Sequence, residues 1–401
     1  MLAAYSYPVA YLEIMVSFLS GTRARNTVLQ IAVVILTAFI LLTFWFTLQR
    51  NLPSQGITSG FSFLQRTTGW DITFSPIEYT TRSTYQRVLL VGFLNTLYVG
   101  LLGLVGAMLI GFVVGLMRTS SNLLMNIIGT TYVELFRNVP LILQAIVWYA
   151  VFTHLPRPKD AYTIGNTIFL SNRGLQLPSL TFSRLDAVLY AILLISVITA
   201  LGLLVRWQQK SRARLPWLFI SLLSFGLLIL VAFIFAFFGR EAGQALMSIP
   251  EVKGFRFEGG VAIKPEFSAL LLAISAFGGA YIAEIVRGGL LSVRKGYLEA
   301  ARALGFKTNK VNEFVRFPLA IRAIIPPLGN RLIWLMKATT IGIAIGYPDF
   351  FMVVSTSINQ SGQTMELILI LMVGFLLINF TISRIMNAIN RSVAIKGQGG
   401  K

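Results

Sequence analysis

A polar, basic segment interrupts the long apolar runs of this chain, and it constrains the fold more than any other feature. Residues 299–318 read EAARALGFKTNKVNEFVRFP and combine good helix formers with one central glycine and a terminal proline. In a chain that is 55% hydrophobic and only 12% charged, a stretch this polar has to lie in water. Its spacing is too regular for an ordinary connecting loop, so we expect an ordered structure.

The apolar runs around this segment predict an integral membrane protein. Several of them reach about 20 residues, the length that an α-helix needs to cross a bilayer. Backbone groups in lipid must be bonded internally, so each span is expected to be a helix. We predict an all-α membrane protein with about eight transmembrane helices. The expected spans are 27–48, 88–117, 132–153, 185–205, 217–238, 266–286, 333–355 and 365–388.

The charged residues exclude several classes of function. The net charge of +19 fits the basic cytoplasmic loops of a membrane protein better than a nucleic-acid-binding surface. The chain has no cysteine, and His154 is its only histidine. No metal site, disulfide or histidine-centred catalytic triad is therefore expected. A phosphate loop of the form G-x-x-x-x-G-K-[ST] is also absent from the sequence, so the chain is not expected to be an ATP-hydrolysing enzyme.

The distribution of basic residues predicts the orientation in the membrane. With both termini in the cytoplasm, the cytoplasmic segments hold 20 of the 34 Lys and Arg residues, although the outside segments are longer. Reversing the orientation would reverse this bias, so cytoplasmic N- and C-termini are preferred. The same orientation places residues 299–318 where a cytoplasmic partner could reach them.

The polar segment is expected to form two short helices joined by a turn. Residues 292–294 can start the first helix, and Gly305 fits the position just after its end, where a left-handed backbone closes a helix at little cost. Residues 310–317 can form a second helix, which Pro318 is expected to stop. Small Ala300, Ala301 and Gly305 would let another protein approach closely. The alternative is a solvated linker without a partner.

The spacing of this segment resembles the EAA loop of ABC-importer permease subunits. Glu299 and the two alanines are followed by three residues and Gly305, and nine more residues lead to Val315. Val315 stands for the usual isoleucine, Phe317 for the usual leucine, and Pro318 ends the pattern. The resemblance implies that Glu299 and its neighbours transmit the motion of an ATPase to the membrane helices.

Other segments extend the resemblance to the permeases of the polar amino-acid ABC importers, the histidine and glutamine permease type. They are residues 93–97 (FLNTL), 132–141 (YVELFRNVPL), 283–289 (AEIVRGG) and 325–330 (IPPLGN). The length of the chain and the segment NQSGQ at 359–363 are similar to the larger general L-amino-acid permeases. The family fold is the type I ABC-importer permease, with a core of five helices.

The resemblance also implies a division of the chain. Residues 1–86 would be an N-terminal segment with an extra transmembrane helix, which is expected to be retained because a signal-peptide cleavage site is lacking. Two extra transmembrane helices would be inserted between the two parts of the core. The expected parts are the first core part at 87–153, the insertion with its outside loops at 154–265, the second core part with the EAA loop at 266–395, and a tail at 396–401.

The same resemblance implies the partners. ATP and magnesium would bind to separate ATPase subunits, and this chain would hold no cofactor. An extracytoplasmic binding protein would deliver an L-amino acid to a dimer of this chain with a homologous permease, or with a second copy of itself, in a bacterial inner membrane. The alternative is a secondary amino-acid transporter driven by an ion gradient, which would leave the EAA-like loop unexplained.

Polar groups within the predicted spans are candidates for the substrate path, because such groups are costly in lipid and often functional. They are Asn95, Thr96, Tyr281, Glu284 and Asp349. Two of them have a structural alternative. Glu284 could pair with a nearby arginine such as Arg137 or Arg287, and Asp349 could cap a helix.

Overall fold

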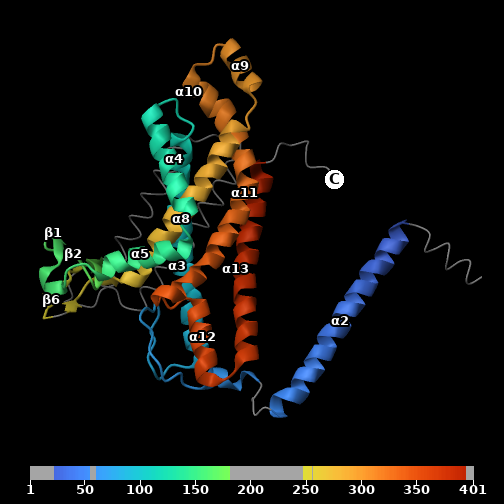
Figure 1. Ribbon diagram of the computed structural model, residues 1–401, viewed down its shortest axis with the longest axis vertical. Helices are drawn as coiled ribbons and strands as arrows, with labels where there is room; N and C mark the ends of the chain where they lie inside the picture. The colour runs from blue at the N-terminus through green and yellow to red at the C-terminus, as the bar shows by residue number, and fades with distance from the viewer. Residues whose placement is uncertain (1–21, 55–59, 181–246, 255, 394–401) are drawn as a thin grey trace, which may run out of the picture.

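Figure 1 shows the computed structural model, which describes residues 22–54, 60–180, 247–254 and 256–393. The spans expected at 185–205 and 217–238 lie outside the described residues. The α-helices are α2 (Thr22–Ser54), α3 (Tyr85–Met117), α4 (Leu123–Asn138), α5 (Leu141–Thr153), α8 (Pro265–Leu291), α9 (Lys295–Ala303), α10 (Thr308–Val311), α11 (Phe317–Ala338), α12 (Phe350–Ser361) and α13 (Thr364–Val393).

These helices make a membrane protein, as predicted. Within the described residues, five helices are long and apolar enough to cross a membrane, or six if the bent pair α4–α5 counts as one span. They confirm the spans predicted at 27–48, 88–117, 266–286 and 365–388. The described part of the chain does not establish the predicted total of eight.

Close packing of α3 against α8 forms the centre of the bundle. A Cβ atom added at Gly111 of α3 would lie 2.5 Å from the Cβ of Ile282 on α8, and one at Gly115 would lie 2.6 Å from the Cβ of Val286. Small residues let membrane helices approach closely, so that dispersion contacts hold them together. Larger side chains at these two glycines would push α3 and α8 apart.

The span predicted at 132–153 is not one straight helix, because the chain bends there by 102° between α4 and α5. Pro140 lacks an N–H group and disfavours helical backbone in the residue before it. Val139 is accordingly extended, with φ −92° and ψ 125°. The side-chain amide of Gln144 donates to the carbonyl oxygens of Phe136 and Val139, both at 2.9 Å. These bonds satisfy acceptors that the helix end leaves free.

The prediction of one span at 333–355 is wrong. Helix α11 ends at Ala338 and a 3-10 helix, η4 (Thr339–Ile345), follows. Gly346 then turns the chain with a left-handed backbone at φ 78°, and α12 starts afresh at Phe350. The apolar stretch that can cross the membrane is instead Thr308–Ile345.

Two segments within the predicted insertion, one before and one after its expected transmembrane helices, pair as strands, which the sequence analysis did not foresee. They form an antiparallel sheet in the order β1-β2-β3-β8, with register pairs such as Leu175 with Ile263. The strands are β1 (Tyr162–Ile164), β2 (Ile168–Ser171), β3 (Gly174–Leu177), β4 (Ser179–Leu180), β5 (Met247–Ser248), β6 (Glu251–Lys253), β7 (Arg256–Glu258) and β8 (Val261–Ile263). The pairs β4–β5 and β6–β7 complete this region. The sheet ties the start of α8 to the chain that follows α5.

Candidate functional site

Helix α9, with the turn after it, forms the tip of the bundle at the end shown uppermost in Figure 1. Gly305 has a left-handed backbone at φ 84°, as predicted. The N–H of Gly305 donates to the carbonyl of Arg302 at 2.9 Å, and that of Phe306 donates to the carbonyl of Ala301 at 3.2 Å. This pair of bonds is the Schellman motif, which satisfies the last carbonyls of a helix and favours glycine at the left-handed position.

The outer face of this tip is exposed and combines apolar with charged side chains. A Cβ atom added at Gly305 would meet nothing within 4 Å. Leu304 is 79% exposed and Tyr297 is 55% exposed. Glu299 and Ala300 are exposed too, whereas Ala301 is buried beneath them. Exposed apolar groups that gather in one place are typical of a surface that binds another protein.

The second half of the segment differs from the prediction. Helix α10 is followed by a π-helical turn, η3 (Asn312–Arg316), in which the N–H of Phe317 donates to the carbonyl of Asn312. Val315 is half-buried there. Pro318 does not stop a helix, because it lies in the first turn of α11. Proline is favoured in the first turn of a helix, because its fixed φ already suits the helical backbone.

Three predicted path residues lie together in the buried centre of the bundle. Asn95, Thr96 and Asp349 are all fully buried. The side-chain amide of Asn95 donates to the carbonyl oxygen of Pro348 at 2.8 Å, and the hydroxyl of Thr96 accepts from the N–H of Phe350 at 2.9 Å. Asp349 caps α12, its expected alternative role. These bonds fasten α3 to the start of α12, and substrate contact by the three residues stays a prediction.

Glu284 of α8 lies at the centre of a cluster of arginines. It accepts a hydrogen bond from Arg118, which follows α3, and another from Arg287 at 2.9 Å. A guanidinium nitrogen of Arg137 from α4 lies 3.7 Å from the same carboxylate. Both expected partners are therefore present, and Arg118 is a third that the sequence analysis did not name. The cluster joins α3, α4 and α8.

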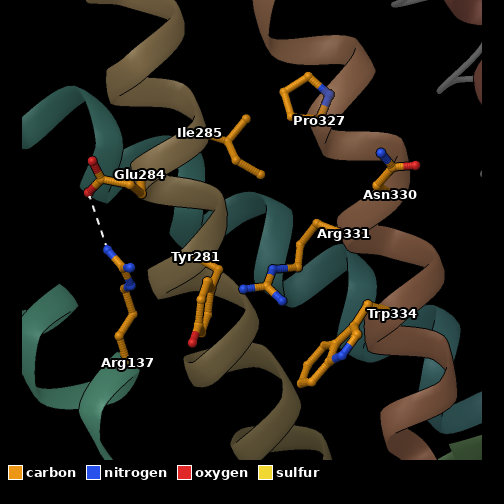
Figure 2. A pocket seen from close by; sticks show the side chains of 8 residues that line it. All are labelled: Arg137, Tyr281, Glu284, Ile285, Pro327, Asn330, Arg331 and Trp334. Atoms are coloured by element: carbon orange, nitrogen blue, oxygen red, sulfur yellow. Dashed lines mark ion pairs between the residues drawn. The ribbon is translucent and has the colours of Figure 1, made fainter.

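Tyr281 and Glu284 face a cavity of about 380 Å³ between α4, α8 and α11. Figure 2 shows Arg331 reaching from α11 toward Tyr281 of α8. Its guanidinium carbon lies 3.5 Å from the ring centre of Tyr281 and 4.9 Å from that of Trp334. Arg137 approaches the ring of Tyr281 as well, at 5.0 Å. The residues that line the cavity are Arg137, Tyr281, Glu284, Ile285, Pro327, Asn330, Arg331 and Trp334.

The structure thus separates the predicted residues into three places, namely the tip at α9, the buried centre and this cavity. Sequence reasoning missed Arg331 and Trp334. It placed the start of a span at residue 333 and counted Arg331 among the basic residues of the cytoplasmic segment. The spacing of Pro327, Arg331 and Trp334 is a signal that could have found the cavity wall, since residues three or four apart share one face of a helix.

The sequence profile described as "Binding-protein-dependent transport system inner membrane component" matches residues 192–395, about half of the chain. The permease protein YhdX of Escherichia coli (strain K12) is 40% identical over 352 residues, which cover 86% of this chain and 88% of that protein. The chain belongs to this family. It is therefore a multi-pass component of an inner membrane and part of a transport system that depends on a binding protein.

Other family members are described by what they transport. The "General L-amino acid transport system permease protein AapQ" of Rhizobium johnstonii is 37% identical over 372 residues, or 90% of this chain and 91% of that protein. A solved structure described as "Crystal structure of an amino acid ABC transporter with histidines" aligns with a TM-score of 0.45 at 18% identity, over 77% of this chain and 95% of that chain.

Proposed function

We propose that this protein is the membrane permease of an ATP-driven importer of L-amino acids. The proposal extends family membership with the substrates named for relatives such as AapQ. The observation that carries it is the helix α9 with its turn, a small exposed helix that ends in a glycine cap with open space around it. The family match lends no support to the alternative of a transporter driven by an ion gradient.

The tip at α9 is the surface on which ATPase subunits would act. ATP and magnesium would bind to those subunits, and this chain would supply the apolar and small residues they touch. Two permease chains would form the path, either this chain with a homologous partner or two copies of it. An extracytoplasmic binding protein would deliver the amino acid at the opposite side of the membrane.

The arrangement of helices supports a cytoplasmic C-terminus. Helix α13 starts beside α12 and runs back toward the end of the bundle that carries α9 (Figure 1). The end of α13 at Val393 and helix α9 then face the same compartment. If ATPase subunits bind α9, this compartment is the cytoplasm, in agreement with the distribution of basic residues.

The permease would perform no covalent chemistry. ATP binding would bring the two ATPase subunits together and push on the two copies of the tip, and hydrolysis would release them. The helices would alternate between inward-facing and outward-facing packing, which are two populated states of one bundle. The chain would contribute a path for the substrate, and α9 would transmit the movement of the ATPase to the membrane helices.

The test is the substitution Gly305→Val in the assembled transporter. A β-branched residue in the left-handed region costs roughly 1–2 kcal/mol, and the side chain would also project where the ATPase comes close. We expect the variant to insert in the membrane, to lose ATP-dependent amino-acid uptake and to retain less ATPase on purification. Glu299→Lys should give the same result, because it reverses an exposed charge on the same surface.

Gly254→Val is the matched control. Gly254 is also left-handed, at φ 65°, and a Cβ atom there would also meet nothing within 4 Å. It lies in the turn between β6 and β7, away from α9 (Figure 1). This control should keep its uptake and its ATPase. Normal uptake by both Gly305→Val and Glu299→Lys, with the ATPase still bound, would reject the coupling role.

A further inference from the structure

Positive charge exceeds negative charge around the cavity between α4, α8 and α11. Arg118 and Arg287 are hydrogen-bonded to Glu284, and Arg137 lies 3.7 Å from the same carboxylate. In the described part of the chain, no ion pair within 4 Å includes Arg331. Three guanidinium groups therefore share the carboxylate of Glu284, and Arg331, which lines the cavity with Arg137, has no carboxylate of its own among the described residues. Charges inside a membrane protein are normally paired, so an unbalanced group of this kind predicts a negatively charged ligand.

The position of Arg331 leaves most of its hydrogen-bond donors available. Its guanidinium group lies over the ring of Tyr281 and near that of Trp334, at 3.5 and 4.9 Å from the two ring centres. Aromatic rings contact the flat faces of a guanidinium, whereas the N–H donors radiate from its edge. Stacking and a hydrogen bond with Tyr281 therefore orient Arg331, and its remaining N–H donors are available to bind an anion.

The cavity beside Arg331 is open rather than enclosed, and its volume is that of a small-molecule site. Its volume of about 380 Å³ lies within the range of about 300–1,000 Å³ that is usual for ligand pockets. Ile285, Pro327 and Trp334 supply apolar walls, and the exposed Asn330 supplies an amide. Figure 2 shows Arg331 between α8 and α11, with Arg137 on the far side of Tyr281.

We propose that Arg331 and Arg137 form a carboxylate-binding subsite for the transported amino acid within the membrane part of the permease. The proposal rests on the proposed function and adds to it a second recognition step, after release from the binding protein. Arg331 would bind the carboxylate with two parallel N–H donors, a geometry that a guanidinium favours. Arg137, held in place by Glu284 and Tyr281, would add its charge.

The first experiment measures binding directly. The permease–ATPase complex, purified without binding protein, is titrated with L-glutamate and separately with L-glutamine, which differ by one carboxylate. We expect Arg331→Gln to weaken the binding of both by about tenfold or more, the effect of losing a charge-assisted pair of hydrogen bonds. An equal loss for both ligands identifies the α-carboxylate as the bound group, and a larger loss for glutamate identifies its side-chain carboxylate.

Two further variants separate recognition from folding. Arg331→Lys keeps the positive charge but loses the planar guanidinium group with its two parallel donors. It should therefore fold as wild type does and bind amino acids with an affinity between those of wild type and Arg331→Gln. Arg384→Gln is the matched control, because Arg384 of α13 is exposed, lies 5.5 Å from the ring centre of Phe380 and does not line the cavity. It should bind both amino acids as wild type does.

Unchanged binding by Arg331→Gln, in a complex of normal stability, would overturn the subsite. Loss of co-purified anionic phospholipid from Arg331→Gln, with amino-acid binding unchanged, would overturn it as well and assign the cavity to a lipid headgroup. ATP-dependent uptake by the wild-type complex in proteoliposomes tests the proposed function separately. If wild type imports amino acids while Arg331→Gln binds and imports equally well, only the subsite is rejected.

Discussion

The substitution Glu284→Gln tests the arginine cluster that joins α3, α4 and α8. The amide replaces the only carboxylate that lies within 4 Å of Arg118, Arg137 and Arg287 among the described residues. It keeps nearly the same shape and one oxygen acceptor, but it removes the negative charge. Three guanidinium groups would then repel one another without a counter-charge, so we expect the folded complex to lose stability.

The exposure of the partners sets the size of this loss. The side chain of Arg118 is only 9% exposed, whereas that of Glu284 is 33% exposed. Breaking a buried ion pair by removing one partner costs about 3–5 kcal/mol, and an exposed pair contributes about 0–1 kcal/mol. Since Glu284 is partly solvated and the amide still accepts a hydrogen bond, we expect a loss of about 2 kcal/mol.

The assay is thermal unfolding of the purified complex in detergent, followed by the fraction of protein that stays monodisperse. A loss of this size should lower the apparent midpoint by roughly 4–8 °C, at the 2–4 °C per kcal/mol typical of larger domains. Glu258→Gln is the matched control. It breaks the pair with Lys253, whose side chain is 59% exposed while that of Glu258 is 54% exposed, so its midpoint should stay near that of wild type.

A double variant decides whether the pair itself is responsible. Arg118→Gln combined with Glu284→Gln should be less destabilised than the sum of the two single variants, by roughly 0.5–3 kcal/mol for groups in contact. An unchanged midpoint for Glu284→Gln would refute the ion-pair reasoning. If its transport fell at the same time, Glu284 would act in the substrate path instead.

Three further predictions concern packing, the helix break and the orientation. Gly111→Leu should reduce the yield of assembled complex, because its Cβ atom would lie 2.5 Å from a side chain of α8, whereas Gly288→Leu, with nothing within 4 Å, should not. Gln144→Leu removes two hydrogen bonds at the break between α4 and α5 and should cost about 1–2 kcal/mol in unfolding free energy. A single cysteine that replaces exposed Ser62 should react with an impermeant outside reagent in intact cells, and one that replaces exposed Thr308 should not. Labelling of the cysteine at position 308 would contradict the predicted orientation.

Local rules predicted the first half of residues 299–318, here called the coupling segment, because its structure depends on neighbouring residues alone. Helix formers followed by a glycine indicate a helix with a left-handed cap, and Gly305 has that backbone. The same rules went wrong at Pro318, because a proline after helix formers fits either a helix end or the first turn of the next helix. Only the π-helical turn before it, in which helix continues into α11, decides between the two.

Hydropathy predicted the long helices but not the direction of the chain within an apolar run. The run at 132–153 contains Pro140, which bends it by 102°. The run at 333–355 contains Gly346 and Pro348, which separate α11 from α12. The mean hydropathy of a segment indicates whether it can lie in lipid. It cannot distinguish one straight helix from two short helices packed against other parts of the protein.

The cavity could not be predicted because it is made by residues distant in sequence. Tyr281 and Arg331 belong to different helices, and their 3.5 Å contact depends on how α8 packs against α11. Sequence analysis recognised Tyr281 and Glu284 as polar groups in a span. It could not know that Arg331 lies opposite them, since the polarity of Arg331 placed it outside any span.

The coupling segment and the cavity are connected through the two helices that flank the segment. Helix α8 ends at Leu291, just before α9, and α11 begins at Phe317, just after the π-helical turn. Tyr281 lies about 15 Å back along α8 from its end, and Arg331 lies about 21 Å into α11, at a rise of about 1.5 Å per residue. A push on α9 that displaced the near ends of these helices unequally would change the contact between Tyr281 and Arg331. We infer that the ATPase would move the same two helices, α8 and α11, that bind the carboxylate of the substrate. Movement of these helices would then be sufficient to release the substrate.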